Sequence, residues 1–151
     1  MPFKKYLSIP LVKWKKALSL HNQYNVHVMA QHNDFGKWGE EMAAQYLRDK
    51  GYAIRHRDWK SGRRDLDIVA VTPDGKTLAF VEVKTRRNNS FVEPETAVDW
   101  RKIRSLTLAA SAYVSRYALD MELRFDIVTV VGEGPNAHID HIEGALLPPR
   151  F

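Results

Sequence analysis

The chain has 151 residues, 44% hydrophobic and 27% charged, which is typical of a single globular domain with an ordinary core. It has no cysteine, which excludes disulfides and thiolate metal sites and favours a cytoplasmic protein. No apolar run reaches the roughly 20 residues that cross a bilayer, so we expect no membrane partner.

The positive charge is concentrated near the N-terminus. The net charge is +5, and residues 1–28 contain five lysines and no acid, whereas the other 18 of the 23 basic residues are balanced by the 18 acidic ones. A polyanion would therefore be attracted by local clusters, not by the total charge. We predict that residues 1–28 are a poorly ordered basic extension and that residues 29–151 form one domain. The alternative is a basic arm that touches nucleic acid or membrane.

Hydrophobic periodicity and turn residues predict the element order α-β-β-β-α-β-β. Gly51 is well placed to stop the first helix, and Asp99 to cap the second. This order favours an α/β fold in which a mixed sheet is flanked by helices. The predicted helices span residues 36–50 and 99–117, and the predicted strands span residues 52–59, 65–72, 77–84, 123–131 and 137–143.

Charged residues interrupt the second and third predicted strands, which are otherwise apolar. A four-residue loop over residues 73–76 places Asp67 opposite Glu82 and Asp65 opposite Lys84, all on one face of a hairpin. Opposed Cβ atoms lie about 4.5–5.5 Å apart, so the two carboxylates repel each other unless a cation lies between them. Mg²⁺ (or Mn²⁺) suits this role, because it takes one or two carboxylates plus water and phosphate oxygens.

This hairpin pattern allows two interpretations. With a metal on Asp67 and Glu82, Lys84 can orient an attacking water or stabilise developing charge, which predicts metal-assisted phosphodiester hydrolysis. The alternative is an exposed sheet face with cross-strand ion pairs, Asp65–Lys84 among them.

Three sequence blocks point to a known family. The blocks are Gly36-Lys37-Trp38-Gly39-Glu40-Glu41, Asp65-Leu66-Asp67-Ile68-Val69 and Phe80-Val81-Glu82-Val83-Lys84-Thr85-Arg86. They resemble the PD-(D/E)XK nuclease superfamily and, more closely, the YraN-like family of uncharacterised bacterial proteins, over roughly residues 35–131. The chain departs from the family at Arg64-Asp65, where Gly-Glu is usual, and at Phe91-Val92, where Phe-Gly is usual.

The resemblance implies a restriction-endonuclease-like fold and specific site residues. Asp67 and Glu82 would hold the metal, Lys84 would be the catalytic lysine, and Glu40 would match the helical acid of some superfamily members. Glu40 could instead favour the start of the helix through the macrodipole. Many superfamily nucleases cut both strands as dimers, so a homodimer is compatible with the resemblance.

Several basic residues surround the predicted site. Charge runs are often solvated faces, but clusters around one site also suit phosphate-backbone contacts. We predict nucleic-acid binding by Arg63, Arg64, Arg86, Arg87 and Lys102.

Other polar and aromatic residues are expected to be structural. For Trp59 and Trp100, packing is favoured over base stacking. Arg124 and Asp126 share one strand face and predict an ion pair. In the last strand, His138, Asp140 and His141 are expected at the surface.

The leading hypothesis is a Mg²⁺-dependent endonuclease that acts on DNA, including branched or structured DNA by analogy with the superfamily. The alternatives are a non-catalytic nucleic-acid-binding module of the same fold and a protein-interaction domain.

Overall fold

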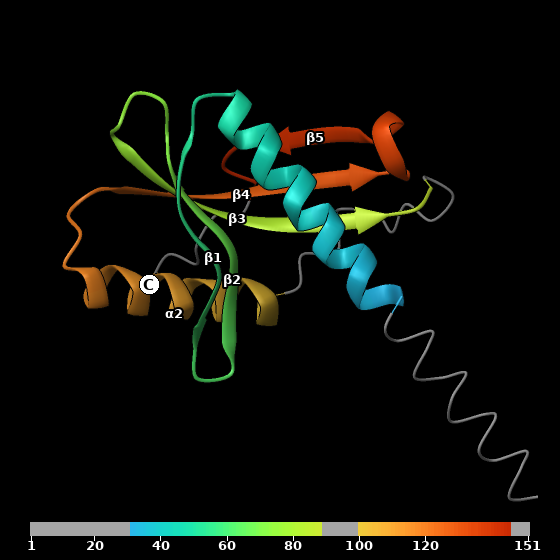
Figure 1. Cartoon of the computed structure of the whole chain (residues 1–151). Helices are drawn as coiled ribbons and strands as arrows, with labels where there is room; N and C mark the ends of the chain where they lie inside the picture. The colour runs from blue at the N-terminus through green and yellow to red at the C-terminus, as the bar shows by residue number, and fades with distance from the viewer. Residues whose placement is uncertain (1–30, 89–99, 146–151) are drawn as a thin grey trace, which may run out of the picture. The chain divides into compact units, whose positions relative to one another are not determined.

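The chain forms two compact units, residues 1–35 and residues 36–151. The computed structural model describes residues 31–88 and 100–145 (Figure 1). Of the first unit only residues 31–35 are described, and they are helical. The predicted extension over residues 1–28, the cap Asp99 and the pair Phe91-Val92 lie outside the described residues.

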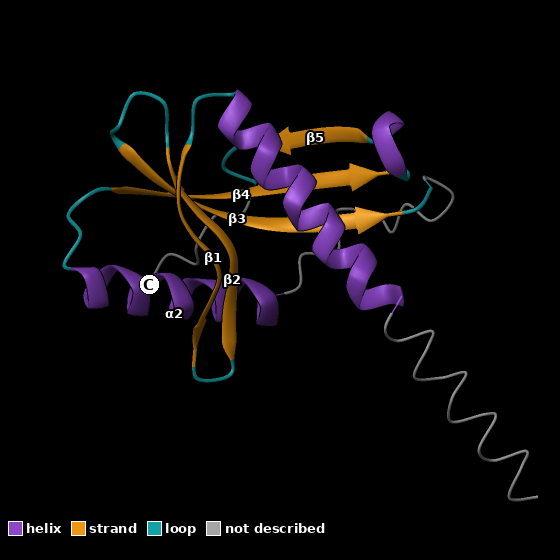
Figure 2. Cartoon of the chain, viewed as in Figure 1, coloured by secondary structure: helices purple, strands orange, loops and turns teal. Residues whose placement is uncertain are grey.

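The second unit contains a five-stranded mixed sheet with two helices, which confirms the predicted fold class and element order (Figure 2). The strand order is β1-β2-β3-β4-β5, in which β3 and β4 are parallel and the other pairs are antiparallel. Because a parallel pair needs a crossover, α2 lies between β3 and β4 in the chain. The elements are the first helix over residues 36–49, β1 Ala53–Ser61, β2 Arg64–Val71, β3 Thr77–Arg86, α2 Trp100–Tyr117, β4 Glu122–Val131, the 3₁₀ turn Gly134–Asn136 and β5 His138–Ile142.

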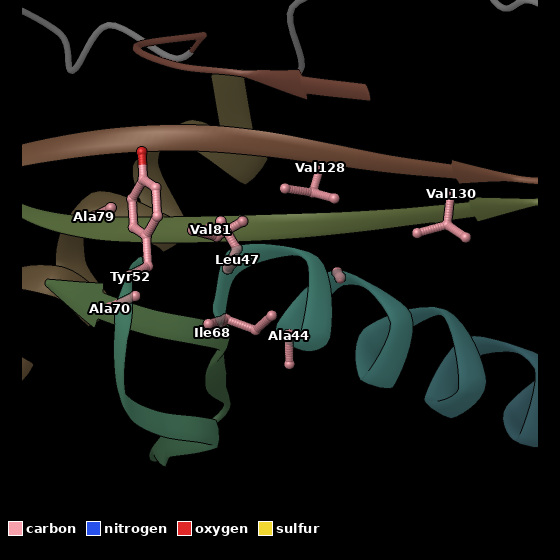
Figure 3. Packing of buried hydrophobic residues seen from close by; sticks show 10 residues of the cluster. Ala44, Leu47, Tyr52, Ile68, Ala70, Ala79, Val81, Val128 and Val130 are labelled. Atoms are coloured by element: carbon pink, nitrogen blue, oxygen red, sulfur yellow. The ribbon is translucent and has the colours of Figure 1, made fainter. Parts of the chain in front are cut away.

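The two helices cover opposite faces of the sheet. Alternate residues along a strand point to opposite faces, and the buried residues of β3 divide in this way. Ala79 and Val81 pack with Leu47 of the first helix, as Figure 3 shows. Leu78 and Phe80 pack instead with the α2 residues, among them Tyr113, which is fully buried. Any side chain on the even-numbered face of β3 therefore faces towards the α2 side.

The two tryptophans differ in burial. Trp59 is buried and donates a hydrogen bond from Nε1 to the Tyr117 hydroxyl at 3.3 Å, which confirms the packing prediction. Trp100 is 66% exposed and so lies outside the core. The physical reason is its place as the first residue of α2, ahead of Ile103, the first buried residue of that helix.

Gly39 marks the closest approach of the first helix to β3. A Cβ atom at Gly39 would lie 2.6 Å from Thr85 Cγ2 and 2.8 Å from Thr85 Cβ, closer than atoms pack. We therefore expect Gly39→Ala to lower the free energy of unfolding by about 1–3 kcal/mol through overpacking. Urea unfolding measures the change. The matched control is Gly36→Ala, where a Cβ meets nothing within 4 Å and where alanine favours a helix by about 1 kcal/mol. A Gly39→Ala protein as stable as the control would contradict this expectation.

The β2–β3 hairpin has the predicted register. The four-residue loop is closed by the Thr72 amide, which donates to the Thr77 carbonyl at 3.0 Å, and Gly75 supplies the positive φ of 74° that the turn needs. The paired residues run from Val71↔Leu78 to Ile68↔Val81. Asp67 and Glu82 are the next residues along their strands, where the ladder stops.

Asp126 of β4 is fully buried and is the centre of a polar network that joins β4 to β5. Arg124 donates two hydrogen bonds of 2.8 Å to its carboxylate, which confirms the predicted ion pair. His141 Nε2 lies 2.9 Å from Asp126 Oδ2, and the Gly144 amide donates to Oδ1 at 2.9 Å. The predicted surface position of His141 is therefore wrong, because alternation along β5 turns it inward while His138 stays exposed.

Candidate functional site

Asp67 and Glu82 follow the last paired residues of β2 and β3, and their carboxylates are close enough for the Glu82 charge to raise the pKa of Asp67. The backbone amide of Val83 donates a hydrogen bond of 2.8 Å to Asp67 Oδ2, which ties the Asp67 side chain to the neighbouring strand. The Glu82 side chain is only 14% exposed. Two acids are thus held together in a partly dry environment at the point where the strands separate.

The Asp67 carboxyl is strongly perturbed by this environment. Burial is the largest cause, the charge of Glu82 adds to it, and together they raise the pKa of Asp67 from 3.8 to about 7. The hydrogen bond from the Val83 amide acts in the opposite direction but does not prevail. Near neutral pH the Asp67 carboxyl is therefore partly protonated unless a cation neutralises it.

The two oxygens of Glu82 have different partners. Oε1 lies 3.0 Å from Lys102 Nζ of α2. Oε2 is buried and has no hydrogen-bond partner within the described part of the chain. A buried polar atom without a partner is unusual and costs free energy unless a water, a proton or an ion satisfies it. Glu82 thus keeps one carboxylate oxygen that a water, a proton or an ion could satisfy.

Glu40 extends the acidic group from the first helix. Burial raises the pKa of Glu40, followed by the charge of Asp58, and the Glu40 charge in turn raises the pKa of Asp67. Residues 31–49 are helical, so Glu40 lies well inside the helix and not in a first turn. The macrodipole acts mainly within a terminal turn, so that alternative for Glu40 is wrong.

Asp58 of β1 belongs to the same acidic group and was missed by the sequence analysis. It lies between the pairs Arg57↔Ile68 and Trp59↔Leu66, which puts it beside Asp67 on the neighbouring strand. Its φ of 47° is in the left-handed region, which strands avoid. The available signal was an acid inside an otherwise basic strand.

The predicted contact between Asp65 and Lys84 is wrong. The β2–β3 ladder stops at Ile68↔Val81, so the two strands have separated before they reach Asp65 and Lys84. Asp65 is paired instead with Lys60 of β1. Lys84 is exposed and follows Glu82 by two residues, which puts it on the same face of β3. The ammonium in contact with Glu82 belongs to Lys102.

The predicted nucleic-acid-binding arginines lie on two strand ends. Arg63 and Arg64 are exposed at the β1–β2 turn, and Arg86 is partly exposed at the end of β3. Arg87 follows it and is hydrogen-bonded to Glu133 at 2.5 Å. A phosphate bound by Arg87 would therefore compete with Glu133.

The donor atoms fit a partly hydrated hard cation. Among the described residues, no three His, Asp or Glu side chains are arranged as a complete metal-ligand set. Two carboxylates are nevertheless the protein share of many Mg²⁺ sites, where water and phosphate supply the other oxygens. Asp67 and Glu82, with its unpartnered Oε2, match that requirement.

Comparison with known sequences places the chain in a family. The profile described as "Uncharacterised protein family UPF0102" matches residues 39–130. The chain belongs to this family. It is the YraN-like family that the sequence blocks predicted, and its matched region contains Glu40, Asp67, Glu82 and Lys102.

Relatives in several bacteria match most of the chain. A UPF0102 protein of Bacteroides thetaiotaomicron is 50% identical over 82% of this chain and all of the relative. One from Phocaeicola vulgatus is 51% identical over 80% of this chain and 98% of the relative. One from Flavobacterium psychrophilum is 40% identical over 78% of this chain and 97% of the relative. Within the described residues, no helix is long and apolar enough to span a membrane.

Proposed function

We propose that this UPF0102 protein is a metal-dependent endonuclease that hydrolyses phosphodiester bonds of DNA. The observation that carries the proposal is the pair of facing carboxylates, in which the pKa of Asp67 is raised to about 7 and Glu82 Oε2 is buried without a partner among the described residues. A binding module or an interaction surface would have no need of two like charges held together away from water.

Each residue has a distinct part in the proposed reaction. Asp67 and Glu82 would hold Mg²⁺ or Mn²⁺, which when bound polarises a phosphoryl oxygen and makes its water a better nucleophile. The exposed Lys84 ammonium lies two residues past Glu82 on the same strand face, where it can orient the attacking water or stabilise the developing negative charge. Glu40 adds a third acid beside Asp67.

Substrate binding is assigned to the basic residues around the site. Arg63, Arg64 and Arg86 would contact phosphate oxygens, and Arg87 would do so on leaving Glu133. Such contacts position the nucleic-acid backbone without reading its sequence, which is compatible with branched or otherwise structured DNA as the substrate.

Light scattering of a DNA complex would distinguish a monomer from a homodimer that cuts both strands.

The test is cleavage by the full chain and by Glu82→Gln. Single-stranded, duplex, flapped and four-way-junction DNA, and RNA, are incubated with Mg²⁺ or Mn²⁺. We expect Glu82→Gln to cut DNA slower by a factor on the order of a hundred or more, as when one group that stabilises a transition-state charge is removed. The matched control is Glu122→Gln, which changes an exposed acid at the opposite end of the β3–β4 pair.

Three results would contradict the proposal. Equal cleavage by wild type and Glu82→Gln would indicate a contaminant or another site. Salt-sensitive DNA binding without cleavage would favour the non-catalytic binding module. Neither binding nor cleavage would favour a protein-interaction domain.

A further inference from the structure

The carboxylate pair of β2 and β3 is in contact with a positively charged side chain from the helix α2. Lys102 Nζ lies 3.0 Å from Glu82 Oε1, and its side chain is 44% exposed. Burial alone would lower the pKa of Lys102, but the hydrogen bond to Glu82 and the charges of Glu82, Asp67 and Asp65 outweigh burial and raise it. The contact with the carboxylates therefore favours the charged form of Lys102.

The position of Lys102 is set by the core. The next residue of α2, Ile103, is buried, as are Leu106 and Ala110 further along the helix. Leu106 and Ala110 pack in one cluster with Phe80, and so hold α2 against the face of β3 that carries Phe80 and, by alternation, Glu82. The ammonium is thus delivered to Glu82 by a packed helix, unlike the pairs formed by flexible side chains on a surface.

We infer that Lys102 is the built-in counterion of the carboxylate pair, and that its ammonium opposes the binding of a divalent cation at Asp67 and Glu82. The inference rests on the proposed function, because it concerns the cation that the reaction would use. A divalent cation on the unpartnered Oε2 of Glu82 would lie close to the Lys102 ammonium on Oε1, and the two positive charges would repel each other. Lys102 acts through Glu82 and is a positioning residue.

The Lys102 ammonium has a natural second partner when a metal is bound. A phosphate of bound nucleic acid would offer it a negative charge, so that it could move away from the metal. Because the Lys102 side chain is partly exposed to solvent, its ammonium can turn from Glu82 towards a bound phosphate. Cation binding and phosphate binding should then strengthen each other, because linkage between two ligands is reciprocal. The protein would hold its metal weakly until a phosphate is present.

The experiment measures the affinity of the full chain for Mn²⁺ alone by calorimetry, without nucleic acid. We expect Lys102→Met and Lys102→Gln to bind Mn²⁺ more tightly than wild type, by on the order of tenfold, since a nearby positive charge has been removed. Lys102→Arg keeps the charge and should bind as wild type does. Arg104→Met removes an exposed charge from the same helix and should change the affinity much less.

The possible outcomes separate this inference from the proposed function. Equal or weaker Mn²⁺ binding by both neutral variants, with wild type binding normally, overturns the role of Lys102 alone. Tighter binding by the neutral variants together with no cleavage of any nucleic acid supports Lys102 and overturns the nuclease. If Mn²⁺ binds to none of the proteins, both are overturned.

Discussion

Replacing Asp67 with asparagine is expected to make the metal-free protein more stable at pH 8 while it removes a ligand for the cation. The Asp67 carboxyl prefers its neutral form in the folded protein, with a pKa near 7 in place of 3.8. Asparagine is neutral at every pH and keeps an oxygen that can accept the hydrogen bond from the Val83 amide. The substitution therefore relieves a repulsion that the wild type tolerates at its site.

The pH dependence follows from the direction of this shift. Between pH 3.8 and about 7 folded Asp67 holds a proton that the unfolded chain has lost, so the wild type loses stability as the pH rises through this window. A tenfold change in proton affinity corresponds to about 1.4 kcal/mol, which sets an upper limit of roughly 4 kcal/mol on the effect. Above about pH 7 the loss is complete.

Urea unfolding with a chelator at pH 5 and pH 8 tests this expectation. The gain in the free energy of unfolding on Asp67→Asn should be larger at pH 8 than at pH 5. Asp120→Asn is the matched control, because it changes an exposed carboxylate outside the sheet and should have little effect at either pH. A variant less stable than wild type at pH 8 would show that the carboxylate is not destabilising in its site.

Replacing Asp126 with alanine is expected to have the opposite and equally large effect. Removing one member of a buried ion pair typically lowers stability by about 3–5 kcal/mol, because the remaining charge is left without its partner. Here Arg124, His141 and the Gly144 amide would all lose their common acceptor. Since whole domains are stable by only about 5–15 kcal/mol, such a loss is severe.

Acid should have the same effect as the substitution. Burial would raise the pKa of Asp126, but the hydrogen bonds from His141, Arg124 and Gly144 outweigh burial and hold the pKa below 3.8. The contribution of Asp126 is thus complete above pH 3.8 and is lost as the pH falls through the lower folded-state value.

Thermal and urea unfolding at pH 7 measure the effect of Asp126→Ala. The matched control is Asp140→Ala on β5, whose side chain is 61% exposed and pairs with His138. An exposed pair of this kind contributes at most about 1 kcal/mol. Equal losses in the two variants would mean that the Asp126 network does not stabilise the attachment of β5.

Local signals were enough for the elements and for one long-range pairing. Alternation and helical spacing predicted α2 and all five strands to within a few residues, and predicted the end of the first helix, whereas its predicted start at residue 36 is wrong because the chain is already helical at residue 31. The turn over residues 73–76 then determined the hairpin register, because a tight loop leaves the strands only one way to pair. For this reason Asp67 and Glu82 were predicted as neighbours, and the separation of the strands beyond them, which removes the contact of Asp65 with Lys84, was not.

What the sequence determined by itself was the fold class, the family blocks and the carboxylate pair, since these depend on residues joined by short turns and regular spacing. The tertiary structure decided which charges meet across elements. It placed Lys102 of α2 on Glu82, Asp58 of β1 near Glu40 of the first helix, and His141 of β5 on Asp126. Those contacts depend on how helices and strands distant in the chain pack around a shared core, and no local pattern carries that information.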